Sequence, residues 1–357
     1  MNSLNLFNKI YFGKKILVTG HTGFKGSWLC IWLKEMGAEV YGYALPPLTP
    51  NDNFVTCNLK KKIQHLSGDV RDKEKLQNYF NEVKPDMAFH LAAQPLVIDS
   101  YNNPHYNYET NLMGTVNFFE AVRNCDSVKM AINVTTDKCY QNNEWIWGYR
   151  ENEAMGGDDP YSASKGCSEL ITHSYLKSFF NKEGTCHIAS GRAGNVIGGG
   201  DWADNRIIPD VMRAYKAGNA SVIRNPDSVR PWQHVLEPLS GYLKLGEKLF
   251  VEGKKYSGGW NFGPAAFENY SVGDVVNQMK KLIPEIKIES HQTSEKLHEA
   301  GLLKLDITKA VNLLSWKPKL DFEQTIAFTL EGYMSEIKST DNLYEARVEQ
   351  INKYCAK

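Results

Sequence analysis

The sequence predicts an α/β fold in which helices cover both faces of a mainly parallel sheet. Three observations lead to this prediction. Short apolar runs alternate with helical segments along the first half of the chain, which is the pattern of a parallel sheet. A glycine-rich turn follows the first apolar run. Each predicted strand ends in small or polar residues, and ligands of open α/β sheets bind at those ends.

The first unit is a strand, a turn and a helix within residues 14–33, KKILVTGHTGFKGSWLCIWL. Ile16–Val18 predict the strand, and 28–33 continue with helical character. The three glycines of the turn, at three-residue spacing, are Gly20, Gly23 and Gly26. Such a turn brings backbone N–H groups and a helix N-terminus to a pyrophosphate, which a side chain at the glycines would obstruct. An ordinary strand-to-helix turn is the alternative interpretation.

The remaining elements of the first half follow in chain order. Pro46 and Pro47 stop the second strand, and Pro85 with Asp86 precedes the fourth. Strands are predicted over 39–44, 63–66, 87–91 and 129–135, and helices from about 73, over 107–124 and from about 161.

Composition limits the function classes. The chain has 357 residues, of which 42% are hydrophobic, enough for one large or two moderate domains. Its 41 basic and 41 acidic residues balance, so no overall field favours nucleic acid or a membrane surface as partner. Seven scattered cysteines lack ligand spacing, so neither a disulfide framework nor a metal site is expected. Without a leader-like start or a long apolar run, we expect a cytoplasmic protein.

The second motif combines residues 135–138, TTDK, at the end of the fifth strand with Tyr161 and Lys165 on the next helix. Residues four apart share a helix face, so the ammonium can lie near the phenol. A nearby cation lowers the tyrosine pKa, and Tyr161 could then take a proton from a sugar hydroxyl near neutral pH. Hydride would leave the same carbon for a nicotinamide. YxxxK also occurs on surface helices, but the upstream glycine turn favours the catalytic interpretation.

These motifs resemble the extended short-chain dehydrogenase/reductases. The residues that carry the resemblance are TGHTGFKG (19–26), GDVRD (68–72), HLAAQ (90–94), Asn111 in NLMGT, and YSASK (161–165). Within that superfamily the chain is similar to the nucleotide-sugar 4,6-dehydratases, and most similar to those that act on CDP-glucose. The segments behind this second resemblance are HTGFKGSWL, GYALPP, TTDKCY, GRAGNVIGGGDWADNRIIPD and VRPWQHVLEPLSGYL.

The resemblance implies a Rossmann-type doubly wound parallel sheet with a smaller C-terminal α+β substrate lobe. Residues 1–190 would form the NAD-binding domain, to which later segments can return, and residues 191–357 mainly the nucleotide-sugar-binding lobe. The implied reaction converts CDP-D-glucose to CDP-4-keto-6-deoxy-D-glucose, with hydride returned to C6 from bound NADH. The product would serve deoxysugar biosynthesis, such as that of lipopolysaccharide O-antigen. A 4,6-dehydratase or epimerase for another nucleotide sugar, and a non-catalytic NAD(P)-binding regulator, are the alternatives.

The resemblance also implies catalytic roles. Tyr161 would act as the base at O4, Lys165 would lower its pKa, and Thr136 would hydrogen-bond O4. Relatives generally follow the threonine with an Asp-Glu pair, whereas this chain has Asp137 and Lys138, a departure that the resemblance to CDP-sugar enzymes predicts. Asp137 would protonate the leaving C6 hydroxyl. Lys138 would either remove the C5 proton in its neutral form or act only electrostatically.

For the cofactor, the resemblance places Asp69 and Val70 beside the adenine, although Asp69 could equally cap the next helix. The full set of expected cofactor residues is Gly20, Thr22, Gly23, Phe24, Lys25, Gly26, Asp69, Val70, Ala92, Ala93, Gln94, Asn111, Thr135, Tyr161 and Lys165. The end of the second strand, 43–46, carries neither an acid for the adenosine ribose nor an arginine for a 2′-phosphate. We favour NAD.

Substrate recognition is expected after about residue 190. Asn195 resembles the asparagine that reaches the sugar-nucleotide phosphate, and Arg206 and Arg230 are candidates for the diphosphate because guanidinium geometry fits phosphate oxygens. His234 is a further candidate, with a structural role as its alternative. Residues 198–202 resemble a substrate-closing loop or a flexible turn. Family members usually dimerise through a four-helix bundle, so we expect a homodimer built on the helices at 107–124 and from 161.

Overall fold

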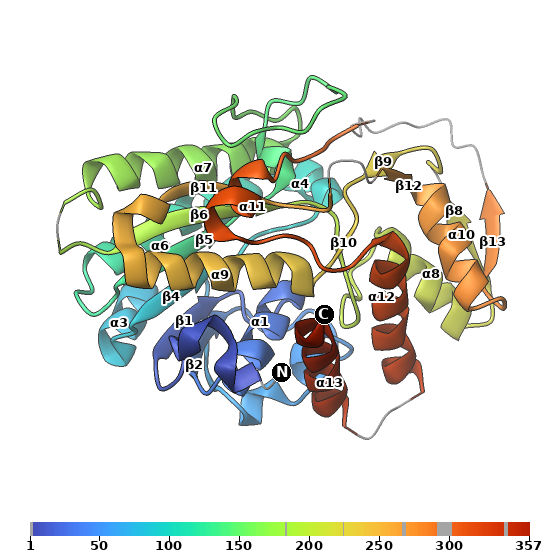
Figure 1. Cartoon of the computed structure of the whole chain (residues 1–357), viewed down its shortest axis with the longest axis horizontal. Helices are drawn as coiled ribbons and strands as arrows, with labels where there is room; N and C mark the ends of the chain where they lie inside the picture. Colours follow the sequence, from blue (N-terminus) through green and yellow to red (C-terminus); the bar gives the residue numbers. More distant parts are fainter. Residues whose placement is uncertain (1–2, 183, 224, 266–268, 291–301, 339–341) are drawn as a thin grey trace.

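The computed structural model describes residues 3–182, 184–223, 225–265, 269–290, 302–338 and 342–357. In these ranges seven parallel strands form one sheet, in the order β11-β6-β5-β4-β1-β2-β3 (Figure 1). The strands are β1 (Lys15–Thr19), β2 (Glu39–Ala44), β3 (Gln64–Ser67), β4 (Met87–His90), β5 (Met130–Val134), β6 (His187–Ala193) and β11 (Gly258–Phe262). The strand order reverses between β1 and β4, as in a doubly wound sheet, and confirms the predicted fold class.

The predicted strands are confirmed within two residues at each end. The helix expected over 107–124 differs, because it is divided into α5 (Pro104–Tyr108), a π-helical turn η3 (Glu109–Met113) and α6 (Gly114–Arg123). Helix α7 (Pro160–Ser178) begins one residue before Tyr161, with Pro160 in its first turn. The Asp159 side chain caps it by accepting from the Ser162 N–H at 2.9 Å, the usual N-cap arrangement.

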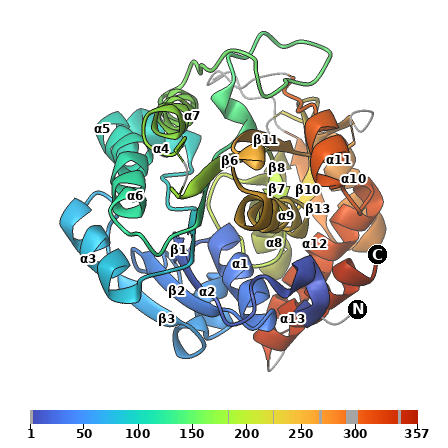
Figure 2. The same cartoon turned by 60° about the vertical axis from the view of Figure 1, so that its left-hand side comes forward.

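Helices lie on both sides of the strands (Figure 2). The side chains of β1 point alternately to two hydrophobic cores, one on each face of the sheet. Leu17 belongs to one core, and Ile16 and Val18 belong to the other, as the period of two in a strand requires. The first face is covered by α3 (Lys73–Val83), α6 and α7. The second is covered by α1 (Phe24–Glu35), α9 (Leu236–Glu252), α11 (Thr308–Leu314) and α13 (Leu343–Ala356).

A smaller lobe of helices and short strands stands at the right of Figure 1 and has its own core, which includes Trp202, Met212 and Tyr333. Its elements are β7 (Val196–Ile197), α8 (Ile207–Lys216), β8 (Ala220–Ile223), β9 (Val229–Arg230), β10 (Gln233–His234), β12 (Tyr270–Ser271), α10 (Val272–Leu282), β13 (Lys287–Ser290) and α12 (Phe322–Ile337). The chain therefore leaves the sheet after β6 and returns to it for α9, β11, α11 and α13.

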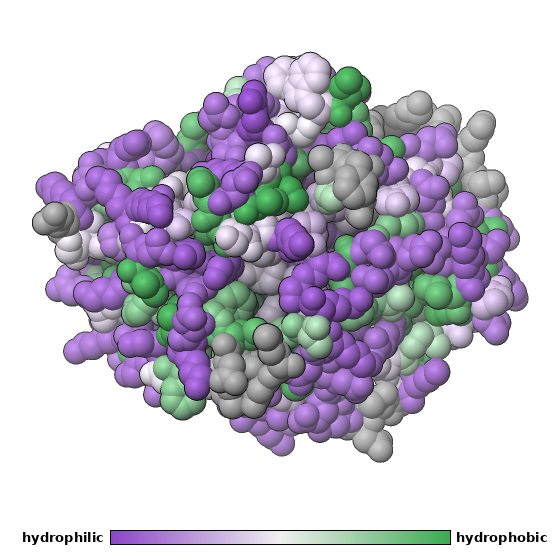
Figure 3. All heavy atoms as spheres, in the orientation of Figure 1, coloured by the Kyte–Doolittle hydropathy of each residue, from purple (hydrophilic) through white to green (hydrophobic). Residues whose placement is uncertain are grey.

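Short elements complete the described chain. They are η1 (Ser3–Lys9), α2 (Asn53–Thr56), η2 (Leu59–Lys61), α4 (Val97–Asn102), η4 (Asp137–Cys139) and η5 (Gly253–Tyr256). The face seen in Figure 3 is mostly hydrophilic, with apolar residues in separate small areas. Among the described residues, none of the helices combines the length and apolar character that crossing a membrane would require.

Candidate active site

The glycine turn lies between β1 and α1, at the carboxyl edge of the sheet. Gly20 has φ +74°, and a Cβ there would stand 2.5 Å from the backbone nitrogen of Ala92. A Cβ on Gly26 would stand 2.2 Å from the Gly20 carbonyl oxygen. A Cβ on Gly23, the N-cap of α1, would have its nearest neighbour, the Gly20 carbonyl oxygen, at 3.4 Å. No described side chain caps this helix. The first-turn N–H groups, which lack helical partners, therefore suit a pyrophosphate.

The residues expected beside the adenine follow β3. Asp69 accepts a hydrogen bond from the Arg71 backbone N–H at 2.9 Å and pairs with the Arg71 guanidinium at 2.7 Å. The buried Val70 accepts from Asn117 through its carbonyl oxygen at 2.9 Å. Across the glycine turn, Thr22 donates to the carbonyl oxygen of Leu45 at 2.9 Å, beyond the end of β2. Because Arg71 already engages the Asp69 carboxylate, contact of Asp69 with the cofactor stays a prediction.

Asn111 projects from the π-helical turn and joins the loop after β4 to helix α7. Its Oδ1 accepts from the Gln94 backbone N–H at 2.8 Å, and its Nδ2 donates to the Gln94 carbonyl at 3.0 Å. The same Nδ2 lies 2.9 Å from the Ser164 hydroxyl on α7. Ala92 and Ala93 stand in the same loop, each partly exposed. A π-helical turn is frequent at functional sites, and this one supports the site geometry expected of Asn111.

The turn η4 carries Asp137 and Lys138, the predicted dehydratase pair. Thr136 caps it by accepting from the Lys138 backbone N–H at 3.3 Å, and its hydroxyl donates to Asp137 Oδ1 at 2.8 Å. The Asp137 side chain is 2% exposed, and its Oδ2 has no hydrogen-bond partner among the described residues. Lys138 is half-buried in the same turn. Because a buried carboxyl oxygen without a partner is costly, Asp137 is suited to meet a ligand hydroxyl here.

Tyr161 and Lys165 lie in the first turns of α7. Burial lowers the pKa of Lys165 to about 8. Burial also raises the pKa of Tyr161 above its usual value, although a hydrogen bond with Thr136 and the charge of Arg206 act in the opposite direction. The expectation of a lowered Tyr161 pKa is therefore wrong. Desolvation of the phenolate raises the pKa by more than the neighbouring side chains lower it.

Below this pair lies a buried network that sequence reasoning missed. Glu169, one turn after Lys165, accepts hydrogen bonds from Thr135 and, at 2.7 Å, from Ser190. Its carboxylate also forms an ion pair with Arg192 at 2.7 Å. The network joins β5, β6 and α7, so it holds the strand end and the catalytic helix in one register. The signal available in the sequence was an acid four residues after Lys165, with an arginine in the following strand.

Four charged groups from separate elements gather at the site. The pKa of Lys25, on α1, is lowered to about 8 by burial first and then by the charges of Lys165 and Arg206, while Asp137 acts to raise it. Arg206, the N-cap residue of α8, pairs with Asp201 at 2.7 Å, and 33% of its side chain is exposed. The structure thus brings together the glycine turn, the catalytic helix and one predicted substrate residue.

The other substrate candidates lie at different depths. Asn195 has φ +33°, and its carbonyl accepts from the Gln233 backbone N–H at 3.2 Å. Arg230 lies on β9, opposite Tyr270 of β12. His234 is 0% exposed, and its ring packs between Trp28 and Phe328, with centroids 6.1 and 5.6 Å away. That position favours a packing role for His234 over contact with substrate. Phe24 lies on the first turn of α1, partly exposed.

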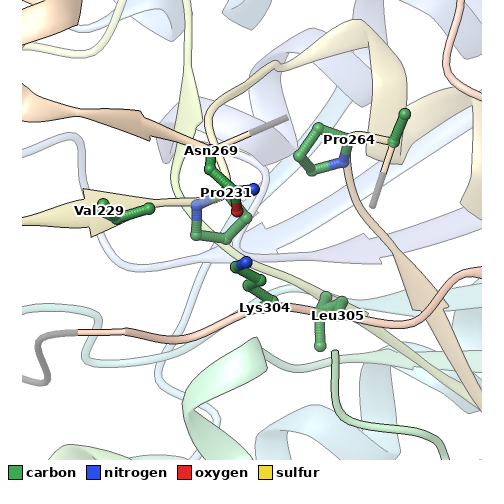
Figure 4. A pocket seen from close by; sticks show the side chains of 7 residues that line it. Val229, Pro231, Pro264, Asn269, Lys304 and Leu305 are labelled. Carbon is green, nitrogen blue, oxygen red and sulfur yellow. The ribbon is translucent and has the colours of Figure 1, made fainter. Parts of the chain in front are cut away.

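A pocket borders the strand that carries Arg230. Figure 4 shows its lining of prolines, a leucine, an asparagine and a lysine side by side. The residues are Val229, Pro231, Pro264, Ala265, Asn269, Lys304 and Leu305. The pocket's cavity volume of about 10 Å³ has room for no more than about one water molecule.

Comparisons with known proteins identify the family of the chain. Residues 17–329 match the family model described as GDP-mannose 4,6 dehydratase. CDP-glucose 4,6-dehydratase of Salmonella typhimurium is 48% identical over 335 residues, covering 93% of each chain. The dTDP-glucose 4,6-dehydratase 1 of Escherichia coli is 26% identical over 94% of this chain and 98% of its own.

A solved structure shares the fold. UDP-glucose-4-epimerase from Stenotrophomonas maltophila, with bound NAD, superposes with a TM-score of 0.78 at 18% identity, covering 92% of this chain and 100% of that one. The family match extends over most of the chain, and the Salmonella typhimurium relative is similar throughout. The chain therefore belongs to the GDP-mannose 4,6 dehydratase family and, within the extended short-chain dehydrogenase/reductases, to the nucleotide-sugar 4,6-dehydratases.

Proposed function

We propose that the protein dehydrates CDP-D-glucose to CDP-4-keto-6-deoxy-D-glucose. The observation that carries this proposal is the buried Asp137 carboxyl, whose Oδ2 has no partner among the described residues, on the same turn as Lys138. An epimerase or simple reductase needs only the Thr136, Tyr161 and Lys165 set. The substrate of the Salmonella typhimurium relative, as its name states it, supports CDP-glucose as the nucleotide sugar.

NAD is the proposed cofactor. The open approach to Gly23 and the uncapped first turn of α1 fit its pyrophosphate, and the partly exposed Ala92 and Ala93 are the proposed nicotinamide contacts. When bound, NAD supplies a hydride acceptor for C4 and a hydride donor for C6, so it is not consumed. The proposed cofactor residues are the fifteen given in the sequence analysis.

At C4, the protein moves one proton and holds one oxygen. Tyr161 takes the O4 proton as general base, and Thr136 hydrogen-bonds O4. Lys165 stands on the same helix face as Tyr161 and stabilises the phenolate by its charge. Burial raises the pKa of Tyr161, and the charge of Arg206 opposes that rise.

At C5 and C6, the dehydratase pair acts. The C4 ketone acidifies the C5 proton, which Lys138 removes in its neutral form. Asp137 protonates the departing C6 hydroxyl, which leaves as water. An electrostatic role for Lys138 is the alternative, and in that case another group removes the C5 proton.

The nucleotide half of the substrate is assigned to the smaller lobe. Asn195, Arg206 and Arg230 are the proposed phosphate contacts. We also keep the division into a cofactor domain over 1–190 and a mainly substrate-binding lobe over 191–357, with α9, β11, α11 and α13 as the later segments that return to the cofactor domain.

A homodimer is proposed through a four-helix bundle of the 107–124 segment and α7. Exposed apolar side chains on these elements support it: Met113 is 45% exposed and Leu170 58%, and burying such side chains is the ordinary driving force of association.

The seven free cysteines support a reducing, cytoplasmic location. A destination of the product in lipopolysaccharide O-antigen stays a prediction.

The test is incubation of the purified protein and NAD with CDP-, dTDP-, UDP- and GDP-hexoses. The 4-keto product is followed by its absorbance in alkali and by mass. We expect CDP-glucose alone to lose one water, without net formation of reduced cofactor. Consumption of a different nucleotide sugar would overturn the substrate, and inactivity throughout with NAD bound would favour a regulator.

A further inference from the structure

The last helix, α13, carries a buried arginine that contacts two other helices. Arg347 is 0% exposed. Its Nε donates to Asn53 Oδ1 at 3.0 Å, its Nη1 donates to the Gly332 carbonyl at 3.1 Å, and its Nη2 forms an ion pair with Glu336. These contacts join α13 to α2 and α12. A fully buried charge is retained only when such partners compensate its desolvation.

The segment 198–202 is held against this arginine. A Cβ on Gly199 would stand 2.7 Å from Arg347 Nη1 and 2.7 Å from the Gly332 carbonyl carbon. The Trp202 indole donates to Glu336 Oε2 at 2.5 Å, and all five residues of the segment are buried. The expectation of a substrate-closing loop is therefore wrong for these residues, because helices α1, α12 and α13 enclose them.

The same segment ends at the residue that holds Arg206. The carbonyl of Asp201 accepts from the Tyr333 hydroxyl at 2.5 Å, and its carboxylate pairs with Arg206 at 2.7 Å. Arg206 in turn is close enough to Tyr161 for its charge to act on the phenol. A continuous set of contacts thus runs from α13 through α12 and Asp201 to Arg206, which acts on Tyr161.

We propose that Arg347 is a positioning residue for the reaction, because it fixes residues 199–202 and thereby places Arg206 for the substrate's diphosphate. This inference rests on the proposed function of Arg206 in binding a nucleotide sugar. Arg347 lies beyond residue 329, where the family match ends. The site would then extend to α13, a helix in which no functional motif is recognisable from the sequence.

The experiment compares Arg347→Lys and Gly199→Ala with Lys353→Ala. Arg347→Lys keeps the positive charge but loses the guanidinium that contacts three partners. Gly199→Ala leaves every charge in place, but its Cβ displaces residues 198–202 from Arg347. Lys353 is the matched control, since it also bridges α13 to α12, through Glu331 at 2.6 Å, but on the surface. For each variant, kcat, KM for CDP-glucose, NAD binding by fluorescence and thermal unfolding are measured.

We expect KM to rise about tenfold in Arg347→Lys and Gly199→Ala, equivalent to about 1.4 kcal/mol, with NAD binding within about threefold of wild type. A smaller fall in kcat is expected as well, because the charge of Arg206 also acts on the Tyr161 phenol. Lys353→Ala should change neither. In an Arg206→Ala background Gly199→Ala should raise KM no further, because the two act through one contact. An unchanged KM in a folded variant, additive effects with Arg206→Ala, or loss of folding in both variants would each overturn the proposal.

The failure of this inference is distinguishable from failure of the proposed function. Hydrogen–deuterium exchange over 199–206 needs no turnover, and we expect it to accelerate in Gly199→Ala but not in Lys353→Ala. If wild type consumed no CDP-glucose, the proposed function would fail while this measurement still decided whether Arg347 holds the segment. Equal exchange in all variants would overturn the positioning role.

Discussion

Gly194 lies directly against the Asp137 carboxyl group: a Cβ on residue 194 would stand 2.0 Å from Asp137 Oδ2. The carboxyl is 2% exposed and accepts from Thr136 on its other oxygen. A glycine after β6 therefore leaves the space in which the proposed acid of the dehydration step sits. The GRAG sequence at 191–194 does not reveal this by itself, since Asp137 is more than fifty residues earlier in the chain.

Gly194→Ala is expected to displace the Asp137 carboxyl and to slow water loss by about 10²- to 10⁴-fold, the range for a lost general acid. Oxidation at C4 does not use Asp137, so reduced cofactor should accumulate on the enzyme, as measured by its absorbance in a single turnover. Gly263→Ala is the control, because its Cβ would have only ordinary contacts, the nearest at 3.5 Å. Full dehydratase activity in Gly194→Ala would contradict the role of Asp137.

Tyr161→Phe should reduce turnover by about 10²- to 10⁴-fold while leaving NAD binding nearly intact, because it removes only the base at O4. Product formation and cofactor fluorescence measure the two properties. Tyr175→Phe removes a hydroxyl from the same helix, where it donates to Glu120 at 2.9 Å, and should leave turnover unchanged. A non-catalytic regulator would keep its activity after either substitution.

Lys138→Met and Lys138→Glu separate the two roles considered for this lysine. If Lys138 is the C5 base, the glutamate variant should retain more dehydratase activity than the methionine variant, because it restores a proton acceptor. If its charge alone matters, the glutamate variant should be the weaker one, since it reverses the charge. The rate of water loss and the exchange of C5 hydrogen with heavy water are the measurements.

The lowered pKa of Lys165 predicts how stability varies with pH. The folded pKa is about 8 against 10.5 for the exposed side chain, so between these values the unfolded chain binds more protons, and stability rises with pH. Below about pH 8 the burial penalty is complete, on the order of 3 kcal/mol at most.

Lys165→Met removes this penalty, so in cofactor-free protein it should be more stable than wild type below pH 8. The gain should shrink towards pH 10.5. Urea unfolding at several pH values measures it, and Lys177→Met, an exposed position on the same helix, should show no such trend. A constant difference between Lys165→Met and wild type across that window would contradict the buried cationic state.

Leu170→Glu should dissociate the proposed homodimer. The side chain is 58% exposed on α7, and a charge at the centre of an apolar contact is costly to desolvate. Sedimentation velocity measures the effect. Val251→Glu, 64% exposed at the end of α9, introduces the same charge away from the proposed bundle and should leave the mass unchanged. A monomeric wild type would contradict the dimer.

Local sequence patterns were sufficient to predict much of the fold of this protein. The period of two in β1, the glycines before α1 and the four-residue spacing of Tyr161 and Lys165 depend on neighbours within one turn or strand. For that reason the strand boundaries were predictable within two residues, and the sheet class followed from the alternation of elements. The resemblance of the same motifs indicated the family that the comparisons later showed.

Only the tertiary structure decided the features that join distant segments. The π-helical turn at Asn111, the contact of Gly194 with Asp137 and the anchoring of residues 199–202 by Arg347 each connect parts of the chain far apart in sequence. The raised pKa of Tyr161 is of the same kind, because desolvation depends on everything packed around the phenol. Periodicity reports which face of an element is buried, but the identity of what lies against that face is set when the elements pack.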